Sequence, residues 1–425
     1  GAFIDLGGAD GLLPAGKIHT HSRSGELEGP LKEGQEIQVQ IVRLDLARQR
    51  VSLDLKQVEV IKGASSTLYV GGAIAGLVNL ITKTPGEERE LSFMLNGTSA
   101  LGLDASGFYS ERFGKLGTTM FASYNLGTPY DPADIGLTAI PKFNRFTLNP
   151  KLFVYFDDRT TLNVGVNIIS EERLGGNLEY AKGNQVTDPY FEENETDRIS
   201  SQVQLNRQID DTRRLQFKNS LNFYNRSITI PDYVFAGNQF SSFSELNLSW
   251  GSERLEWITG LNLWTDQFRQ SEGNPDEDLS YSNITVGGFV QNTWNLVPKW
   301  TLESGFRLDY QNQYGWFPLP RFSLMFNPES NWTFRLGGGL GYKTPTVFSE
   351  DAERLQFQNI RPLDTQALNA EKSVGGNFDI NHRMPLAPGL IMTSNLLFYY
   401  TQIQNPLQLT PITGGYEFTQ PNGYV

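Results

Sequence analysis

The stretch LESGFRLDY, residues 302–310, alternates between apolar and polar side chains. Its apolar positions are Leu302, Phe306, Leu308 and Tyr310. Its charged positions are Glu303, Arg307 and Asp309. Successive side chains of an extended chain point to opposite faces, so each set shares one face. The stretch therefore predicts a β-strand with apolar surroundings on one side and water on the other.

The same alternation recurs along the chain. It is seen in TLNVGVNII (161–169), RLQFKNSLNF (214–223) and LEWITGLNLW (255–264). In WTFRLGGGLGY (332–342), the residues predicted to share the apolar face are Trp332, Phe334, Leu336, Leu340 and Tyr342. We count about 15 such strands between residues 86 and 425. A polar face on so many strands is typical of a membrane β-barrel with a wet interior.

The connections between these strands are of two kinds. Short turns are predicted at 113–117, 156–160, 250–254, 295–299 and 327–331, and long polar loops at 127–144, 171–196, 268–281 and 343–372. Trimmed turns at one rim and long loops at the other are expected of an outer-membrane barrel. Tryptophans near predicted strand ends fit an interfacial aromatic girdle. These are Trp250, Trp257, Trp264, Trp294, Trp300 and Trp332.

Composition narrows the chemistry. The chain has 47 acidic and 35 basic residues, 3 histidines and no cysteine, which excludes disulfides, cysteine-bound zinc and thiol catalysis. His19 and His21 lack a third nearby ligand, and no Ser-His-Asp spacing emerges. The acidic clusters at 192–197 and 274–279 are typical of solvated loops. We therefore expect no enzyme, no catalytic residue, no metal site and no cofactor.

Residues 58–85, VEVIKGASSTLYVGGAIAGLVNLITKTP, combine two β-branched runs with a glycine-rich turn. The stretch lacks the glycine order and the Gly-Lys-Ser/Thr of a phosphate loop. It resembles the end of the plug domain of TonB-dependent outer-membrane receptors, with Val70 where that family usually has glycine. RLGGGLGYKTPTVFSE (335–350) and LNAEKSVGGNFDI (368–380) resemble barrel motifs of the same family. The resemblance spans about residues 53–425.

This resemblance implies an all-β fold, an incomplete transmembrane antiparallel barrel of the plugged 22-strand type. Residues 57–85 would be a C-terminal plug fragment and 86–425 a barrel lacking its last strands. It further implies energised uptake of a scarce ligand, most of all a ferric siderophore or related metal complex, in the bacterial outer membrane. The implied partners are membrane lipid, the small-molecule ligand and TonB, whose binding box we expect before Val58, in sequence that this chain lacks.

Six aromatic residues that we expect on long loops are the ligand-binding candidates, because aromatic side chains give large contact areas at low entropic cost. They are Tyr180, Tyr190, Phe191, Tyr314, Trp316 and Phe317.

Residues 1–56 carry a different signal. GAFIDLGGADGLLPAGKI (1–18), LKEGQEIQVQIVRLD (31–45) and ARQRVSLDLK (47–56) resemble the RNA-binding OB folds of the ribosomal-protein S-one family. The family's first strand is missing, so the predicted fold is partial, and Pro14 stands where the family often has histidine. The resemblance implies single-stranded RNA as a partner and, for this fragment alone, the cytoplasm. The implied contacts are base stacking by Phe3 and phosphate binding by Lys17, Arg43, Arg48 and Arg50.

The two resemblances meet within RVSLDLKQVEVIKG (50–63), where residues 53–56 fit both families. Because the two families work in different compartments, we interpret the chain as a chimera joined at this point. An RNA-binding protein acting through residues 1–56 remains the alternative to an outer-membrane receptor. A soluble β protein, such as a lectin-like sandwich, is a third possibility, although it would not show the alternation of short turns and long loops.

Overall fold

A computed structural model describes residues 2–5, 10–13, 40–45, 50–54, 57–62, 76–274, 277–329, 331–387 and 390–421. Strands dominate these residues, with two short helices, α1 (Leu178–Ala181) and α2 (Glu350–Arg354). No helix in this part of the chain is both long and apolar enough to cross a membrane.

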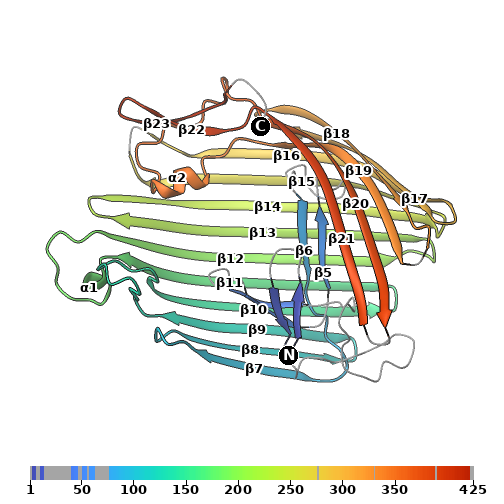
Figure 1. Cartoon of the computed structure of the whole chain (residues 1–425), viewed down its shortest axis with the longest axis horizontal. Coiled ribbons are helices and arrows are strands. Elements are labelled where there is room, and N and C mark those ends of the chain that lie inside the picture. Colours follow the sequence, from blue (N-terminus) through green and yellow to red (C-terminus); the bar gives the residue numbers. More distant parts are fainter. Residues whose placement is uncertain are drawn as a thin grey trace.

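One antiparallel sheet of 15 strands, β7–β21, contains most of the molecule. Each strand pairs with its neighbours in sequence, and the sheet curves strongly between β14 and β21 (Figure 1). The strands are β7 (Glu90–Gly97), β8 (Leu103–Phe113), β9 (Leu116–Gly127), β10 (Lys142–Asp157), β11 (Thr160–Gly176), β12 (Phe191–Gln208), β13 (Arg213–Ile230), β14 (Tyr233–Ser252), β15 (Leu255–Glu272), β16 (Tyr281–Val297), β17 (Trp300–Gln311), β18 (Gly315–Phe326), β19 (Trp332–Lys343), β20 (Glu371–Ala387) and β21 (Leu390–Gln404). The predicted all-β fold and its approximate strand count are confirmed.

The two faces of this sheet have inverted polarity compared with a water-soluble protein. On β17 the apolar Phe306, Leu308 and Tyr310 are 45%, 38% and 42% exposed. The polar Arg307 and Asp309, which alternate with them, are 1% and 0% exposed. An apolar outer face and a polar inner face are what a barrel in lipid requires. The facial assignment predicted for residues 302–310 is confirmed.

Tyr342 departs from its predicted face. It shares strand parity with the exposed Leu336 and Leu340, but it is 5% exposed and its ring stacks on Phe317, with 3.8 Å between centroids. The pairing of β18 with β19 extends only to Arg321 and Gly339. Tyr342 pairs only with Lys372 of β20 and has no partner on β18. Its ring packs inward on Phe317 and its hydroxyl donates to Asp309, so the prediction that placed it on the apolar face is wrong.

The connections confirm the asymmetry of the two rims, with corrected boundaries. The short-turn rim has connections at 114–115, 158–159, 209–212, 253–254, 298–299 and 327–331. The other rim, called here the loop rim, has connections at 98–102, 128–141, 177–190, 231–232, 273–280, 312–314 and 344–370. The predicted loops 171–196 and 268–281 are too long, because β11, β12 and β15 continue into them. Polar side chains there belong to strands that extend past the apolar band.

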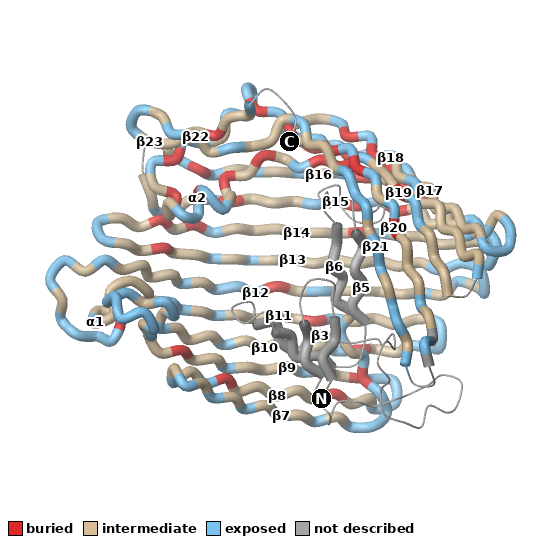
Figure 2. Tube along the Cα trace, in the orientation of Figure 1, coloured by how far each residue is buried: buried red, intermediate tan, exposed pale blue. Residues whose placement is uncertain are grey.

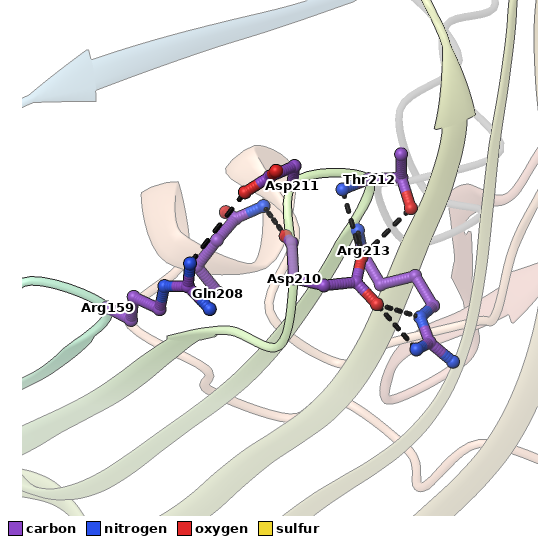
Figure 3. Close-up of polar contacts among 6 residues, drawn as sticks. All are labelled: Arg159, Gln208, Asp210, Asp211, Thr212 and Arg213. Atoms are coloured by element: carbon purple, nitrogen blue, oxygen red, sulfur yellow. Dashed lines mark hydrogen bonds and ion pairs between the residues drawn. The ribbon is translucent and has the colours of Figure 1, made fainter.

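The β12–β13 turn shows how the short-turn rim is stabilised (Figure 3). The Asp210 carboxylate accepts hydrogen bonds from the backbone N–H groups of Thr212 and Arg213, at 3.0 and 2.9 Å. Its other oxygen lies 2.5 Å from the Arg213 guanidinium. Gln208 donates to the Asp210 carbonyl, and Arg159 of the preceding turn lies 3.8 Å from Asp211. Aspartate is frequent in tight turns because its carboxylate accepts hydrogen bonds from the backbone N–H groups of the same turn.

The predicted aromatic girdle is partly visible at the same rim. Trp250 of β14 and Trp257 of β15 stack across the strands, with ring centroids 6.4 Å apart. Trp300 and Trp332 begin β17 and β19 and stack on Phe326 and His382. Trp264 differs, since it lies further along β15 on the face shared with Asp266.

Two smaller sheets come before the barrel in sequence. β1 (Ala2–Asp5), β2 (Asp10–Leu13), β3 (Gln40–Asp45) and β4 (Arg50–Asp54) form a four-stranded sheet in the order β1-β2-β4-β3. The β2–β4 pair is parallel and the other two pairs are antiparallel. Four strands suit an OB fold, which has five, with one strand absent. β5 (Gln57–Lys62) and β6 (Gly76–Ile81) form an antiparallel pair.

The loop rim is covered by its own apolar cluster. The 344–370 connection and the hairpin of β22 (Gln408–Ile412) and β23 (Gly415–Thr419) contribute to it together with β13–β15. Buried positions gather around α2 and along β15–β20, and they are sparse on β7–β9 (Figure 2). The core members are Ile228, Phe235, Phe268, Leu279, Val347, Ala352, Phe357, Ile360, Leu368 and Phe418.

Candidate ligand-binding site

A cavity of about 310 Å³ lies between the loop-rim ends of β13–β16 and the 344–370 connection. Its volume is at the lower end of the range for small-molecule sites. Side chains from four neighbouring strands reach it because inward positions alternate along each strand. The side chains used below come from β13 (Arg226), β14 (Phe235, Gln239), β15 (Asp266, Phe268), β16 (Tyr281) and the connection (Phe348, Glu353).

This cavity lies near the loop-rim end of the apolar band of the barrel. On β15 the exposed outward apolar residues end at Leu263, before Asp266 and Phe268. On β16 they begin at Ile284, after Tyr281. On β13 and β14 the outward Phe223 and Phe240 are level with Gln239, so the cavity lies at the loop-rim edge of the apolar band and extends beyond it.

One wall of the cavity is aromatic. Phe268 packs edge-on against Phe348 with centroids 4.9 Å apart, and it lies 6.0 Å from Phe235 and from Tyr281. Gly237 makes this possible, because a Cβ there would lie 2.4 Å from the Phe268 ring. A glycine on β14 thus allows the ring to lie against the strand backbone.

The opposite part of the cavity is polar and centred on Asp266. Gln239 donates to one carboxylate oxygen at 2.7 Å, and the Tyr281 hydroxyl donates to the other at 3.0 Å. Burial raises the pKa of the Asp266 carboxyl, while these two hydrogen bonds oppose the rise. Burial also raises the pKa of Tyr281, so its hydroxyl stays protonated and donates.

An ion pair attaches the 344–370 connection to the barrel wall. The guanidinium of Arg226 donates to both carboxylate oxygens of Glu353, at 2.6 and 3.1 Å, and its Nε donates to Asn194 at 3.2 Å. The Tyr233 hydroxyl donates to the Phe357 carbonyl at 3.1 Å. These contacts hold α2 at the side of the cavity.

A second polar cluster lies on the inner face of β15–β19. Arg307 and Asp309 are paired at 2.7 Å, the Arg307 Nη2 donates to Asn262 at 3.0 Å, and the Tyr342 hydroxyl donates to Asp309 at 3.1 Å. Gly287 leaves room for the cluster, because a Cβ there would lie 2.2 Å from Asp309 Oδ1. The pair is fully buried, so removing one partner would leave an uncompensated charge.

A concavity of about 750 Å³ is on the outer face of β18–β21. Its lining includes Phe322, Leu340, Phe378 and Phe398, with glycines between them. All four side chains are 37% exposed or more and face the direction of the apolar band. We therefore assign this groove to the lipid-facing surface and not to the ligand-binding site.

The predicted ligand-binding residues fall in three places, and none of them lines the 310 Å³ cavity. Tyr180 on α1 stacks on Phe191 at 4.8 Å, and Tyr190 beside them is 56% exposed. Phe317 and Tyr314 pack with Tyr342 in a buried cluster. Trp316 is 63% exposed and packs on the outward Tyr310 at 5.0 Å.

The sequence prediction missed Arg226 and Asp266 because they lie within strands, and it did not select Tyr281, at the end of the predicted loop 268–281. The sequence marks these three residues only by their positions in the alternating pattern. Each lies on the polar face of its strand, near the end of the strand at the loop rim. Among the predicted RNA contacts, Phe3, Arg43 and Arg50 are on β1, β3 and β4, whereas Lys17 and Arg48 are outside the described residues. His19 and His21 are also outside them.

Within the described part of the chain, no group of three or more histidine, aspartate or glutamate side chains is arranged to hold a metal ion.

Charge is distributed unequally between the two rims. The seven loop-rim connections carry 3 basic residues, Lys182, Arg354 and Arg361, and 12 acidic residues. The short-turn rim has nearly balanced charge, with 5 acidic and 4 basic residues. The acidic residues of the loop rim are Asp131, Asp134, Glu179, Asp188, Asp232, Asp276, Glu277, Asp278, Glu350, Asp351, Glu353 and Asp364.

Comparisons with known families agree with both parts of the chain. A model described as TonB dependent receptor-like, beta-barrel matches residues 95–425. A model of the S1 RNA binding domain matches residues 1–56.

Among curated proteins, the iron-regulated outer membrane virulence protein of Vibrio cholerae is 24% identical over 309 residues, covering 69% of this chain and 45% of that protein. The chain thus spans about half the length of this relative. The small ribosomal subunit protein bS1 of Rhizobium meliloti is 39% identical over 84 residues, covering 19% of this chain and 15% of that protein.

Solved structures share the barrel fold at low identity. The siderophore receptor PirA of Pseudomonas aeruginosa has a TM-score of 0.64 at 16% identity, covering 86% of this chain and 66% of PirA. The ferric enterobactin receptor PfeA of the same organism has a TM-score of 0.67 at 16% identity, covering 85% and 62%. The copper transporter OprC has the same TM-score at 13% identity, covering 85% and 61%. Similar barrels therefore serve different cargoes.

Proposed function

Because this chain belongs to the TonB-dependent receptor family, we propose that it is part of an outer-membrane receptor for a metal chelate, most of all a ferric siderophore. The barrel belongs to the bacterial outer membrane, where relatives of this family are found. The observation that carries the proposal is the cavity between Phe268, Asp266 and Glu353, which lies at the loop-rim edge of the apolar band. The solved structures named above are two siderophore receptors and a transporter, which supports transport as the role of the barrel.

The proposed mechanism follows from the inverted polarity of the sheet. Apolar side chains face lipid, and polar side chains such as Arg307 and Asp309 face inward. A ligand bound at the loop rim then needs a polar path inward, and a plug filling that path prevents free diffusion. In this proposal residues 57–85 are the end of the plug and 86–425 the barrel wall. TonB supplies the force that moves the plug.

The test measures the binding of ferric siderophores to the purified full chain in detergent. Quenching of tryptophan fluorescence reports the binding. Phe268→Ala removes the central ring of the aromatic wall and is expected to weaken binding at least roughly tenfold. Phe93→Ala, on the exposed outer face of β7, is the matched control and should bind as wild type does. Equal binding by the two variants would remove the cavity from the proposal.

The second candidate function is binding of single-stranded RNA through residues 1–56, favoured by the S1-type match. Phe3, Lys17, Arg43, Arg48 and Arg50 are the proposed contacts. Binding should weaken as salt concentration rises, because phosphate contacts release counterions. An Arg43→Ala, Arg48→Ala, Arg50→Ala triple variant that still binds RNA as wild type does would argue against this function.

We further propose that the chain is a chimera joined at residues 53–56. The S1-type match ends at residue 56, whereas the receptor match begins at residue 95 and belongs to another compartment. Long-read sequencing of the source locus tests this proposal. An unbroken, expressed reading frame containing both parts would refute it.

A further inference from the structure

Building on the proposed receptor function, we infer that the cavity selects chelates by charge. It takes a metal chelate with no net negative charge, and Asp266 accepts a hydrogen bond from a protonated amine of that chelate.

The charged side chains that line the cavity are one guanidinium, Arg226, and two carboxylates, Asp266 and Glu353. The lining therefore has a formal excess of one negative charge. An anionic ligand would need to find a cation here, and a cationic ligand would need a carboxylate.

Arg226 is already occupied. Both of its Nη atoms donate to Glu353, at 2.6 and 3.1 Å, and its Nε donates to Asn194 at 3.2 Å. These bonds use three of the five N–H donors of the guanidinium, and the Glu353 carboxylate compensates its charge. A ligand carboxylate or catecholate that used the other two N–H groups would lie beside the Glu353 carboxylate, and the two negative charges would repel each other.

Asp266, by contrast, is half-buried without a cation. Its hydrogen bonds come from two neutral donors, Gln239 and Tyr281, and no described lysine, arginine or histidine forms an ion pair with it. A carboxylate has about four acceptor positions, so positions remain for a ligand donor. A charge-assisted hydrogen bond from an ammonium group would compensate the buried charge.

The aromatic wall favours the same class of ligand. The ring centroids of Phe268, Phe348 and Tyr281 are 4.9 to 6.1 Å apart, and Asp266 lines the same cavity. Aromatic faces attract ammonium groups and repel anions. A chelate with an amine arm and apolar linkers would satisfy both the wall and the carboxylate.

The charge of the loop rim also favours ligands without negative charge. The loop-rim connections have 12 acidic and 3 basic residues, whereas the short-turn rim is nearly balanced. A rim of one sign concentrates ligands of opposite charge and lowers the encounter rate of ligands of like charge. A trianionic ferric chelate is therefore disfavoured both on approach and in the cavity.

The test uses the full chain in detergent and three ferric probes of similar size. They are a tris-hydroxamate with a free terminal amine, the same chelate with its amine acetylated, and a tris-catecholate carrying three negative charges. Wild type should bind the amine probe roughly 10- to 100-fold more tightly than the acetylated probe, the worth of one charge-assisted hydrogen bond. It should bind the tris-catecholate most weakly.

Asp266→Asn should abolish the preference for the amine probe over the acetylated probe, a change in the ratio of two affinities that a general loss of binding would not produce. Asp266→Glu should retain part of the preference. Asp211→Asn is the matched control, because it also removes one negative charge but at the short-turn rim, where Asp211 is 98% exposed. Its preference for the amine probe should equal that of wild type.

The outcomes separate this inference from the receptor function. Binding of the tris-catecholate as tightly as the amine probe, or an unchanged amine preference in Asp266→Asn, overturns the charge selection and leaves the receptor function standing. Failure of all three probes to bind overturns both. If Asp266→Asn does not fold, the order of the three probe affinities for wild type tests the charge selection by itself.

Discussion

Gly287 on β16 offers the most direct test of the buried polar cluster. A Cβ at this position would lie 2.2 Å from Asp309 Oδ1, 2.6 Å from Asn262 Oδ1 and 2.7 Å from Arg307 Nη2. Real Cβ atoms do not approach polar atoms so closely, so Gly287→Ala must displace the Arg307–Asp309 pair. Its neighbour Gly288 is on the outer face, where a Cβ would meet only Leu261 Cδ2 at 3.4 Å among side chains.

The expected magnitudes differ accordingly. Overpacking alone costs about 1–3 kcal/mol, and disrupting a buried ion pair costs about 3–5 kcal/mol, so we expect Gly287→Ala to destabilise the barrel by about 3 kcal/mol. Gly288→Ala should be neutral or stabilising by less than about 1 kcal/mol, because alanine restricts the unfolded chain.

Urea unfolding of the two variants in detergent, followed by tryptophan fluorescence, measures this difference. Equal stability of Gly287→Ala and Gly288→Ala would refute the role assigned to Gly287 and the tight packing of the cluster.

Three further predictions concern other contacts. Arg307→Met alone should destabilise the barrel by about 3–5 kcal/mol in urea unfolding, while Arg307→Met combined with Asp309→Leu should recover most of the loss, since no buried charge remains; a double variant no better than the single would contradict this. Glu353→Gln should increase the rate of limited proteolysis within residues 344–370 a few-fold, with Glu350→Gln, on the exposed side of α2, as a control that leaves the rate unchanged. The Arg213 side chain and the turn N–H groups hold the pKa of Asp210 below its ordinary value of 3.8. A carboxylate with a lowered folded-state pKa stabilises above the unfolded pKa, so the stability difference between wild type and Asp210→Asn should stay constant above about pH 5 and shrink as pH falls below 3.8; a difference that grows on acidification would contradict the assignment.

Alternation predicted the barrel because it is a local property. At residues 302–310 each side chain's face follows from parity, and the burial of Arg307 and Asp309 agrees with it. Tyr342 escaped this rule because its direction depends on Phe317 and Asp309, which are distant in sequence. Loop boundaries failed for a related reason: polar residues at 191–196 form a strand because β11 and β13 pair with them.

The cavity was harder to predict than the wall. Arg226, Asp266 and Phe348 come together only when three distant segments pack, and no spacing in the sequence encodes that meeting. Loop aromatics such as Trp316 were the reasonable choice from composition, but its position opposite Tyr310 places it on the outer face. Residue type indicates what a side chain is able to bind, whereas strand register determines whether it reaches the ligand.

The length of β14 has a consequence for access. Its 20 residues, at about 3.3 Å each, make a strand of about 66 Å. A tilt of about 40° leaves about 50 Å along the membrane normal, against a hydrocarbon core of about 30 Å. Much of the remaining height belongs to the β13–β14 hairpin, whose short 231–232 tip is at the loop rim, the rim that we expect to face the medium outside the cell. Antibodies, phages and membrane-impermeant labels would therefore meet this hairpin before they reach the lipid.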